Sequence, residues 1–301
     1  MRCSLPGVMR SKLFVPASSP SLFRKALASD ADTICFDLED AVLPERKTEA
    51  RSNLRELFAI GFHTSKMILV RVNHVHSAYF AEDLTAVVYP AVSALVLPKV
   101  GDSAEARDVA DALPALERER GVQRRIAILA TIESPRGLRL AREIADGNDR
   151  IAGLQLGLAD LFEPLGVRRS DGGAAYQVRF QLRLAAGEAG IPCFDSAFAN
   201  FKDEDGFARE AVEARRLGFA GKSCIHPAQI AAANRIFSPS TDEIAESRRI
   251  VEAARQASAI GLSAFALDGR MIDEPFIRRA EAIVRRAEII RTMERNQEKT
   301  D

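Results

Sequence analysis

The chain has 301 residues, with 42 Lys and Arg against 42 Asp and Glu, so its formal net charge is zero. That balance argues against a nucleic-acid-binding protein, which would carry a basic excess. Hydrophobic residues make up 47% of the chain, which is ample for a packed core and excludes a disordered protein. The sequence contains no uncharged apolar run of about 18 residues, so we expect no membrane span.

The N-terminal sequence and the cysteines bear on the cellular compartment. MRCSLPGVMR lacks the apolar stretch of a secretory signal. The four cysteines show neither a CxxC pair nor zinc-ligand spacing; they are Cys3, Cys35, Cys193 and Cys224. We therefore expect a cytoplasmic protein, in a reducing environment.

Short apolar, β-branched runs alternate along the chain with longer segments of helical spacing. We predict strands at 12–17, 33–40, 66–73, 94–100, 125–134, 151–161, 191–198 and 219–227. Strands that are apolar throughout are typical of a parallel sheet covered on both faces. Eight successive βα units predict a (β/α)₈ TIM barrel over residues 1–237. No G-x-G-x-x-G follows the first strand, which weakens the dinucleotide-binding alternative.

The pattern changes after about residue 228. Three helical segments follow, AQIAAANRIF, DEIAESRRIVEAARQAS and PFIRRAEAIVRRAEIIRTMERNQ, with a short link at 261–275 between the last two. This tail is too long to be only the last barrel helix. We expect a C-terminal helical extension over 238–301 that acts as a lid on the barrel mouth or on a neighbouring subunit.

Polar residues end most of the predicted strands. Barrel enzymes place their chemistry at the C-terminal ends of the strands, so these residues are expected to face one mouth. They are Asp37, Glu39, Asp40, Arg71, Asn73, Lys99, Glu133, Asp160, Asp195, Ser223 and His226.

The acidic members of this set indicate a cation site. Several carboxylates at one mouth repel one another unless protons or a cation neutralise them. With oxygen ligands and no Cys or His cluster, the predicted ion is Mg²⁺. Glu133 and Asp160 end adjacent predicted strands and are the first choice as ligands, with Glu39 and Asp40 ordering metal-bound water. Any single acid among them could equally cap the helix that follows it.

Arg71 follows the apolar run KMILV, so its guanidinium needs a partner. Spacing alone leaves two possibilities open: an internal ion pair with Asp37 or Glu39, or a bidentate contact with a substrate carboxylate. A Schiff-base role for Lys99 is a minor possibility. His226, just before a proline, is expected to be structural.

Taken together, the motifs RSKLFVPAS, DTICFDLEDAV, ILVRVN, LVLPKV, TIESPRG, LGLADL, GKSCIHPAQI and GRMIDEP are similar to those of a known family. The chain resembles the citrate lyase β-subunit-like family of the HpcH/HpaI aldolase superfamily, which includes malyl-CoA and citramalyl-CoA lyases. The resemblance covers nearly the whole chain. It implies a Mg²⁺-dependent barrel that acts on a 3-hydroxyacyl-CoA thioester, often as a homotrimer.

The resemblance also implies roles for individual residues. Glu133 and Asp160 match the metal ligands, with Glu133 also at the substrate, and Arg71 matches the clamp on the substrate carboxylate. Asp273 matches a catalytic acid that in several relatives reaches the site of an adjacent subunit. Lys25 matches a position near the CoA phosphates. Ala159 stands where many members have an acid before the metal-binding Asp, which puts the substrate preference in doubt.

The expected reaction is cleavage of the carbon–carbon bond of a citramalyl-CoA, malyl-CoA or citryl-CoA type of thioester to a 2-oxo acid and an acyl-CoA. Two alternatives stay open at this point. One is a thioesterase that hydrolyses malyl-CoA with the same metal and clamp, and the other is a β-subunit-like component of a larger complex with an acyl-carrier partner.

Overall fold

The computed structural model describes residues 2–62 and 64–297. Contacts divide the chain into two compact units, 1–237 and 238–301. None of the helices in the described ranges combines the length and the apolar character that a membrane crossing requires.

The first unit is built on one sheet of parallel strands in the order β7-β6-β5-β4-β3-β2-β1-β8. The strands are β1 (Ser11–Pro16), β2 (Thr33–Asp37), β3 (Met67–Arg71), β4 (Val92–Leu97), β5 (Ala127–Ile132), β6 (Ile151–Leu156), β7 (Cys193–Phe194) and β8 (Lys222–Cys224). Asp195 closes the sheet into a barrel: its N–H donates to the Gly221 carbonyl at 2.8 Å and its carbonyl accepts from the Ser223 N–H at 3.1 Å. The predicted (β/α)₈ TIM barrel is confirmed.

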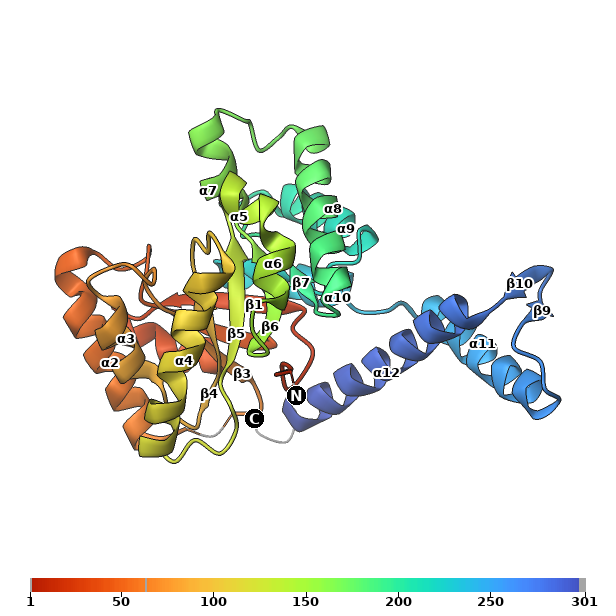
Figure 1. The fold of residues 1–301 in the computed structure, drawn as a ribbon, viewed down its shortest axis with the longest axis horizontal. Coiled ribbons are helices and arrows are strands. Elements are labelled where there is room, and N and C mark those ends of the chain that lie inside the picture. Colours follow the sequence, from red (N-terminus) through yellow and green to blue (C-terminus); the bar gives the residue numbers. More distant parts are fainter. Residues whose placement is uncertain (1, 63, 298–301) are drawn as a thin grey trace. The chain divides into compact units, whose positions relative to one another are not determined.

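Helices follow the strands and lie on the outer side of the barrel (Figure 1). They are α1 (Phe23–Leu27), α2 (Lys47–Ile60), α3 (Phe80–Val87), α4 (Ser103–Glu119), α5 (Pro135–Arg139), α6 (Ala141–Asp146), α7 (Leu158–Phe162), α8 (Gly172–Glu188), α9 (Glu204–Arg216) and α10 (Ile230–Ile236). Several begin at a side-chain cap, such as Asp102, which accepts from the backbone N–H groups of Ala104 and Glu105 ahead of α4. A cap of this kind stabilises a helix by about 1 kcal/mol.

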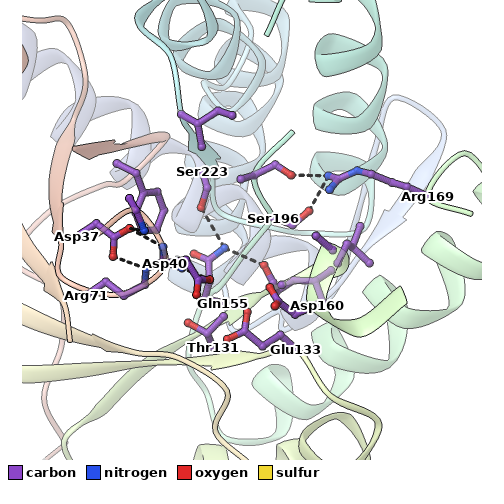
Figure 2. Close-up of a pocket in the computed structure, with 18 of the residues that line it drawn as sticks. Asp37, Asp40, Arg71, Thr131, Glu133, Gln155, Asp160, Arg169, Ser196 and Ser223 are labelled. Atoms are coloured by element: carbon purple, nitrogen blue, oxygen red, sulfur yellow. Dashed lines mark hydrogen bonds and ion pairs between the residues drawn. The ribbon is translucent and has the colours of Figure 1, made fainter. Parts of the chain in front are cut away.

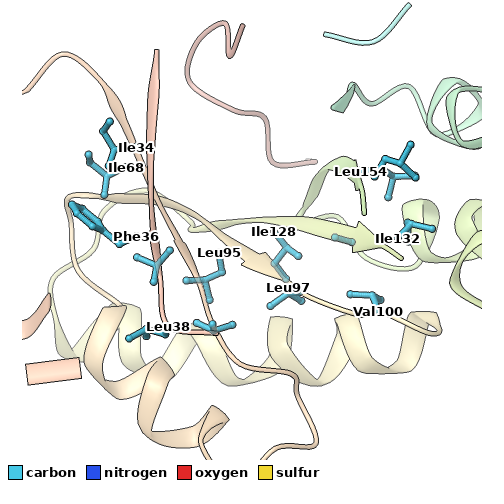
Figure 3. Close-up of a cluster of buried hydrophobic side chains, with 14 of the residues drawn as sticks. Ile34, Phe36, Leu38, Ile68, Leu95, Leu97, Val100, Ile128, Ile132 and Leu154 are labelled. Atoms are coloured by element: carbon cyan, nitrogen blue, oxygen red, sulfur yellow. The ribbon is translucent and has the colours of Figure 1, made fainter. Parts of the chain in front are cut away.

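Alternation along each strand separates two hydrophobic layers. In β5, Ile128, Ala130 and Ile132 pack in the large core between strands and helices, part of which Figure 3 shows. Ala127 and Leu129 instead join the smaller cluster inside the barrel. Because side chains alternate with a period of two, the next residues of odd number, Thr131 and Glu133, continue the inner row toward the mouth.

Several strands are shorter than the sequence predicts, and the difference moves one candidate ligand. The run 151–161 is mostly apolar, but β6 ends at Leu156 and α7 begins at Leu158. Leu161 and Phe162 are buried as helical residues, and periodicity cannot separate such a short apolar helix from a strand. Asp160 therefore lies in the first turn of α7 and not at a strand end.

The second unit consists of α11 (Thr241–Ala259), the hairpin β9 (Phe265–Leu267) and β10 (Arg270–Ile272), and α12 (Glu274–Gln297). A capping box starts α11, in which the Ser240 hydroxyl accepts from the Glu243 N–H. The expected link at 261–275 is thus in part a hairpin. Its turn residues, Asp268 and Gly269, have φ of 51° and 76°, as in a type I′ turn, and a three-residue strand is too short to show alternation.

Candidate active site

A cavity of about 480 Å³ opens at the C-terminal ends of the barrel strands. Its lining comes from β1, β2, β3, β5, β6 and β8 and from the segments after β2, β5, β6, β7 and β8. Figure 2 shows Glu133 and Asp160 on one side, Asp37 and Arg71 on another, and Arg169 with Ser196 on a third. Charged groups of both signs therefore meet in one cavity.

Glu133 is a buried carboxylate of the cavity, with 5% of its surface exposed. Its Oε1 accepts from the backbone N–H of Lys99 at 2.5 Å. Burial, and then the charge of Asp160, raise the pKa of Glu133 to about 8. A buried carboxylate beside another acid is strongly stabilised in its ionised form by a nearby cation.

Gly157 allows Glu133 to take this position. A Cβ at residue 157 would overlap the Glu133 carboxylate and would lie 2.5 Å from the Glu133 Cβ. The φ of Gly157 is −117°, which other residues adopt easily. The glycine is therefore required by close approach and not by its backbone conformation.

The donor set fits Mg²⁺. Within residues 2–62 and 64–297, no group of three or more His, Cys, Asp or Glu side chains is arranged to enclose a metal ion. Mg²⁺ does not need such a cage, because it is commonly held by one or two carboxylates and keeps positions for water and substrate. Buried Glu133 and exposed Asp160 provide that pair at the cavity.

Arg71, at the end of β3, makes the internal ion pairs that the sequence left open. Its Nε and Nη2 donate to the two Asp37 oxygens at 2.7 and 2.6 Å, and its Nη1 lies 3.0 Å from a Glu39 oxygen. Burial lowers the pKa of Arg71, but the Asp37 charge outweighs it and the net change is a rise. Arg71 also lines the cavity, so it is a permanently charged group held in a fixed orientation.

Glu39 and Asp40 form ion pairs with the side chain of Lys99. The Nζ of Lys99 lies 2.8 Å from Glu39 and 3.3 Å from Asp40. Although burial lowers the pKa of Lys99, these carboxylates raise it above the ordinary value overall. A raised pKa disfavours the neutral amine that a Schiff base requires, so these ion pairs argue against that role for Lys99.

The remaining predicted residues are more scattered. Lys25 is exposed on α1 and does not line the cavity. His226 caps the turn after β8 by accepting from the Ala228 N–H, and its ring stacks on Phe201, so it is structural as expected. Asp273 lies in the second unit between β10 and α12, and its Oδ1 is buried with no hydrogen-bond partner in the described part of the chain.

Asp195, expected at the mouth, is not there. It is fully buried and its carboxylate binds Arg179 of α8 at 2.9 Å and Lys222 of β8 at 2.5 Å. The apolar strand pattern could not reveal this, because both partners lie elsewhere in the sequence. Asp195 belongs to an ion cluster that joins the barrel wall to its helices.

Sequence reasoning missed four polar residues of the cavity: Thr131, Gln155, Arg169 and Ser196. Thr131 and Gln155 are polar residues in the middle of apolar strands, and that signal was available. Arg169 comes from the loop before α8 and is held by Glu210 at 2.8 Å and by the Ala197 carbonyl at 2.6 Å. No local pattern marks a loop arginine of this kind.

Comparisons with known proteins agree with this architecture. The HpcH/HpaI aldolase/citrate lyase family model matches residues 10–227. The citrate lyase subunit beta of Escherichia coli K12 is 35% identical over 93% of each chain. The L-malyl-CoA/beta-methylmalyl-CoA lyase of Cereibacter sphaeroides (strain ATCC 17025) is 33% identical over 93% of this chain and 95% of its own. The crystal structure of CitE from Mycobacterium tuberculosis with magnesium, acetoacetate and coenzyme A has a TM-score of 0.74 at 32% identity, covering 94% of this chain and 99% of that one.

Proposed function

The chain belongs to the HpcH/HpaI aldolase/citrate lyase family, and we propose that it is a Mg²⁺-dependent lyase that cleaves the carbon–carbon bond of a 3-hydroxyacyl-CoA thioester to a 2-oxo acid and an acyl-CoA. The observation that carries the proposal is the pairing of Glu133 and Asp160 with the fixed cation Arg71 in one cavity. The malyl-CoA lyase relative and the CitE complex with magnesium and coenzyme A support it.

In this proposal Glu133 and Asp160 hold the metal. Bound Mg²⁺ would supply a Lewis acid for the oxygens of the substrate. The chain's own contribution is to keep both carboxylates at the mouth, with Glu133 fixed by the Lys99 N–H and packed against Gly157. Glu39 and Asp40 bind Lys99 and Arg71, so they set the charges around the ion and order the water near it.

Arg71 clamps the carboxylate of the 2-oxo acid half. Asp37 occupies the Nε and Nη2 edge of the guanidinium, and Glu39 lies 3.0 Å from Nη1. One N–H of Nη1 and one of Nη2 are left to donate to a substrate oxygen. Because Asp37 holds the group in place before substrate arrives, charge that develops in the transition state meets a donor that needs little reorganisation.

In this proposal Asp273 is the acid that protonates the acyl-CoA product at carbon. Carbon–carbon cleavage removes the proton of the 3-hydroxyl group and leaves an acyl-CoA enolate that must be protonated at carbon, so overall one proton moves from oxygen to carbon. A carboxyl group placed at that carbon can deliver this proton. The buried, unpartnered Oδ1 of Asp273 supports a role of this kind, because an unpaired buried oxygen is costly to the free protein. In the proposal, residues 238–301 form a lid that brings Asp273 to the cavity of an adjacent subunit in a homotrimer, and exposed Lys25 binds the CoA phosphates.

The test is to incubate the purified chain with malyl-CoA, citramalyl-CoA and citryl-CoA, with Mg²⁺ or with EDTA, and to identify the products by mass. We expect an acyl-CoA and glyoxylate, pyruvate or oxaloacetate, only when the metal is present. Free CoA with an intact hydroxy acid would instead establish a thioesterase. No turnover of any free CoA thioester would favour a subunit that works only in a larger complex.

A further inference from the structure

Thr131 carries a buried hydroxyl that nothing in the described protein satisfies. It lies on β5 two residues before Glu133, lines the cavity and is 6% exposed. Its Oγ1 has no hydrogen-bond partner. A buried hydroxyl without a partner is destabilising by roughly 1–3 kcal/mol, so its presence at a cavity wall points to a ligand that completes it.

The groups around Thr131 are already committed. Its register partner on β6 is Gln155, whose Oε1 accepts from Lys12 at 2.6 Å. The Gln155 amide N–H groups donate to the carbonyls of Leu156 and Asp195 and to the Ser223 hydroxyl. Gln155 therefore makes its hydrogen bonds to other groups and none to the Thr131 hydroxyl.

Two charged groups near Thr131 also make their hydrogen bonds elsewhere in the protein. Glu133 accepts from the Lys99 backbone through Oε1, and Arg71 points its Nε edge at Asp37. Figure 2 shows Thr131 on the inner row beside Glu133, below Gln155. A small acid bound beside Arg71 and Glu133 would bring carboxylate oxygens, which are strong acceptors, to this part of the wall.

We propose that the Thr131 hydroxyl is a specificity-determining contact that donates a hydrogen bond to a carboxylate oxygen of the 2-oxo acid half of the substrate. This inference rests on the proposed lyase function. It predicts that an acid lacking an oxygen at this point is rejected, because the hydroxyl then stays unpaired in the complex.

The test compares Thr131→Val, which keeps the shape and removes the hydroxyl, with Thr131→Ser, which keeps the hydroxyl. In the ligand-free protein Thr131→Val should unfold at the same temperature as wild type or higher, because no hydrogen bond is lost. Its kcat/KM should fall about 10- to 100-fold, the effect of losing one hydrogen bond to a charged group, and Thr131→Ser should recover most of this. The Kd for pyruvate, glyoxylate or oxaloacetate with Mg²⁺, measured by calorimetry, should weaken by a similar factor.

Thr33→Val is the matched control. Thr33 is fully buried at the start of β2 and does not line the cavity, and its Oγ1 also has no hydrogen-bond partner among residues 2–62 and 64–297. The same substitution there should leave both kcat/KM and oxo-acid binding unchanged.

The possible results distinguish the proposed Thr131 contact from the proposed lyase function. The proposed hydrogen bond from Thr131 is overturned if Thr131→Val binds the oxo acids as wild type does. It is also overturned if the loss of binding comes with a fall in unfolding temperature. A wild-type chain that binds none of the three acids overturns it as well. If wild type binds an acid through Thr131 but cleaves no CoA thioester, the contact stands and the proposed lyase function fails.

Discussion

Gly157→Ala tests how tightly the position of Glu133 is set. The new Cβ would lie 2.5 Å from the Glu133 Cβ and 3.1 Å from its Cδ, against a favourable carbon–carbon separation of about 3.5–4.0 Å. Glu133 must therefore retreat by about 1 Å. The φ of −117° suits alanine, so the effect is steric and not a backbone strain.

The expected result is a folded protein with an impaired site. Overpacking of this kind is destabilising by about 1–3 kcal/mol, and a misplacement of about 1 Å in a catalytic arrangement lowers the rate about 100-fold. We expect kcat/KM to fall by about that factor and the Kd for Mg²⁺ to rise. Turnover of the CoA thioester and calorimetric titration with Mg²⁺ measure the two effects, and the unfolding temperature reports the stability.

Gly172→Ala is the control. A Cβ at residue 172, in the first turn of α8, meets nothing within 4 Å and its φ is not in the left-handed region. This variant should match wild type in activity and be equally or slightly more stable. The steric reasoning is refuted if Gly157→Ala keeps kcat/KM and Mg²⁺ affinity within about threefold of wild type, since a shift of 1 Å predicts far more.

Three further substitutions test the site and its support. Glu133→Gln should weaken Mg²⁺ binding and lower kcat/KM at least about 100-fold while the circular dichroism spectrum stays native; full activity would rule Glu133 out as a ligand. Asp273→Asn should lower kcat by about 10²- to 10⁴-fold with little change in Mg²⁺ affinity, and co-expression with Glu133→Gln should restore part of the activity if the acid crosses to an adjacent subunit. Burial raises the pKa of Asp195, but Lys222 and Arg179 outweigh burial and hold this pKa below the usual range. The ionised Asp195 therefore stabilises the folded protein at pH values above the ordinary Asp pKa of about 3.9, and this stabilisation is lost as the pH falls through the lowered pKa. Asp195→Asn should therefore lose about 3–5 kcal/mol at pH 7 in chemical unfolding, with the deficit shrinking below about pH 4; an equal deficit at all pH values would contradict this account.

The sequence was sufficient to predict the barrel because its cause is local. Each strand is an apolar run, and each helix shows three- and four-residue spacing, so the order of elements and the strand-end position of Glu133 could be read directly. Asp160 was placed on the wrong element because Leu158, Leu161 and Phe162 are apolar in a helix as they would be in a strand. The hairpin at Phe265–Ile272 was not predicted because each of its strands has only three residues, too few to show an alternating pattern.

What could not be predicted depends on partners distant in sequence. Whether Arg71 pairs with Asp37 or waits for substrate is decided by the register of β2 against β3, which sets Asp37 directly beside it. The burial of Asp195 depends on Arg179 and Lys222, which no spacing rule connects to it. Thr131 could have been noticed as a polar residue on an apolar strand. That its hydroxyl makes no hydrogen bond depends on neighbours such as Gln155, which bonds to Lys12 and Ser223 instead.

The seam between β7 and β8 determines where this cavity can be redesigned. Asp195 uses its backbone to join the two strands and its side chain to bind Arg179 and Lys222. Replacing the side chain with a neutral one leaves these two buried cations without that partner at the point where the barrel closes. Ser196 and Ser223 flank this seam, line the cavity and have small side chains. Libraries aimed at a new acid substrate should therefore vary positions 196 and 223 and keep Asp195, because the ion pairs at the closure of the barrel then stay unchanged.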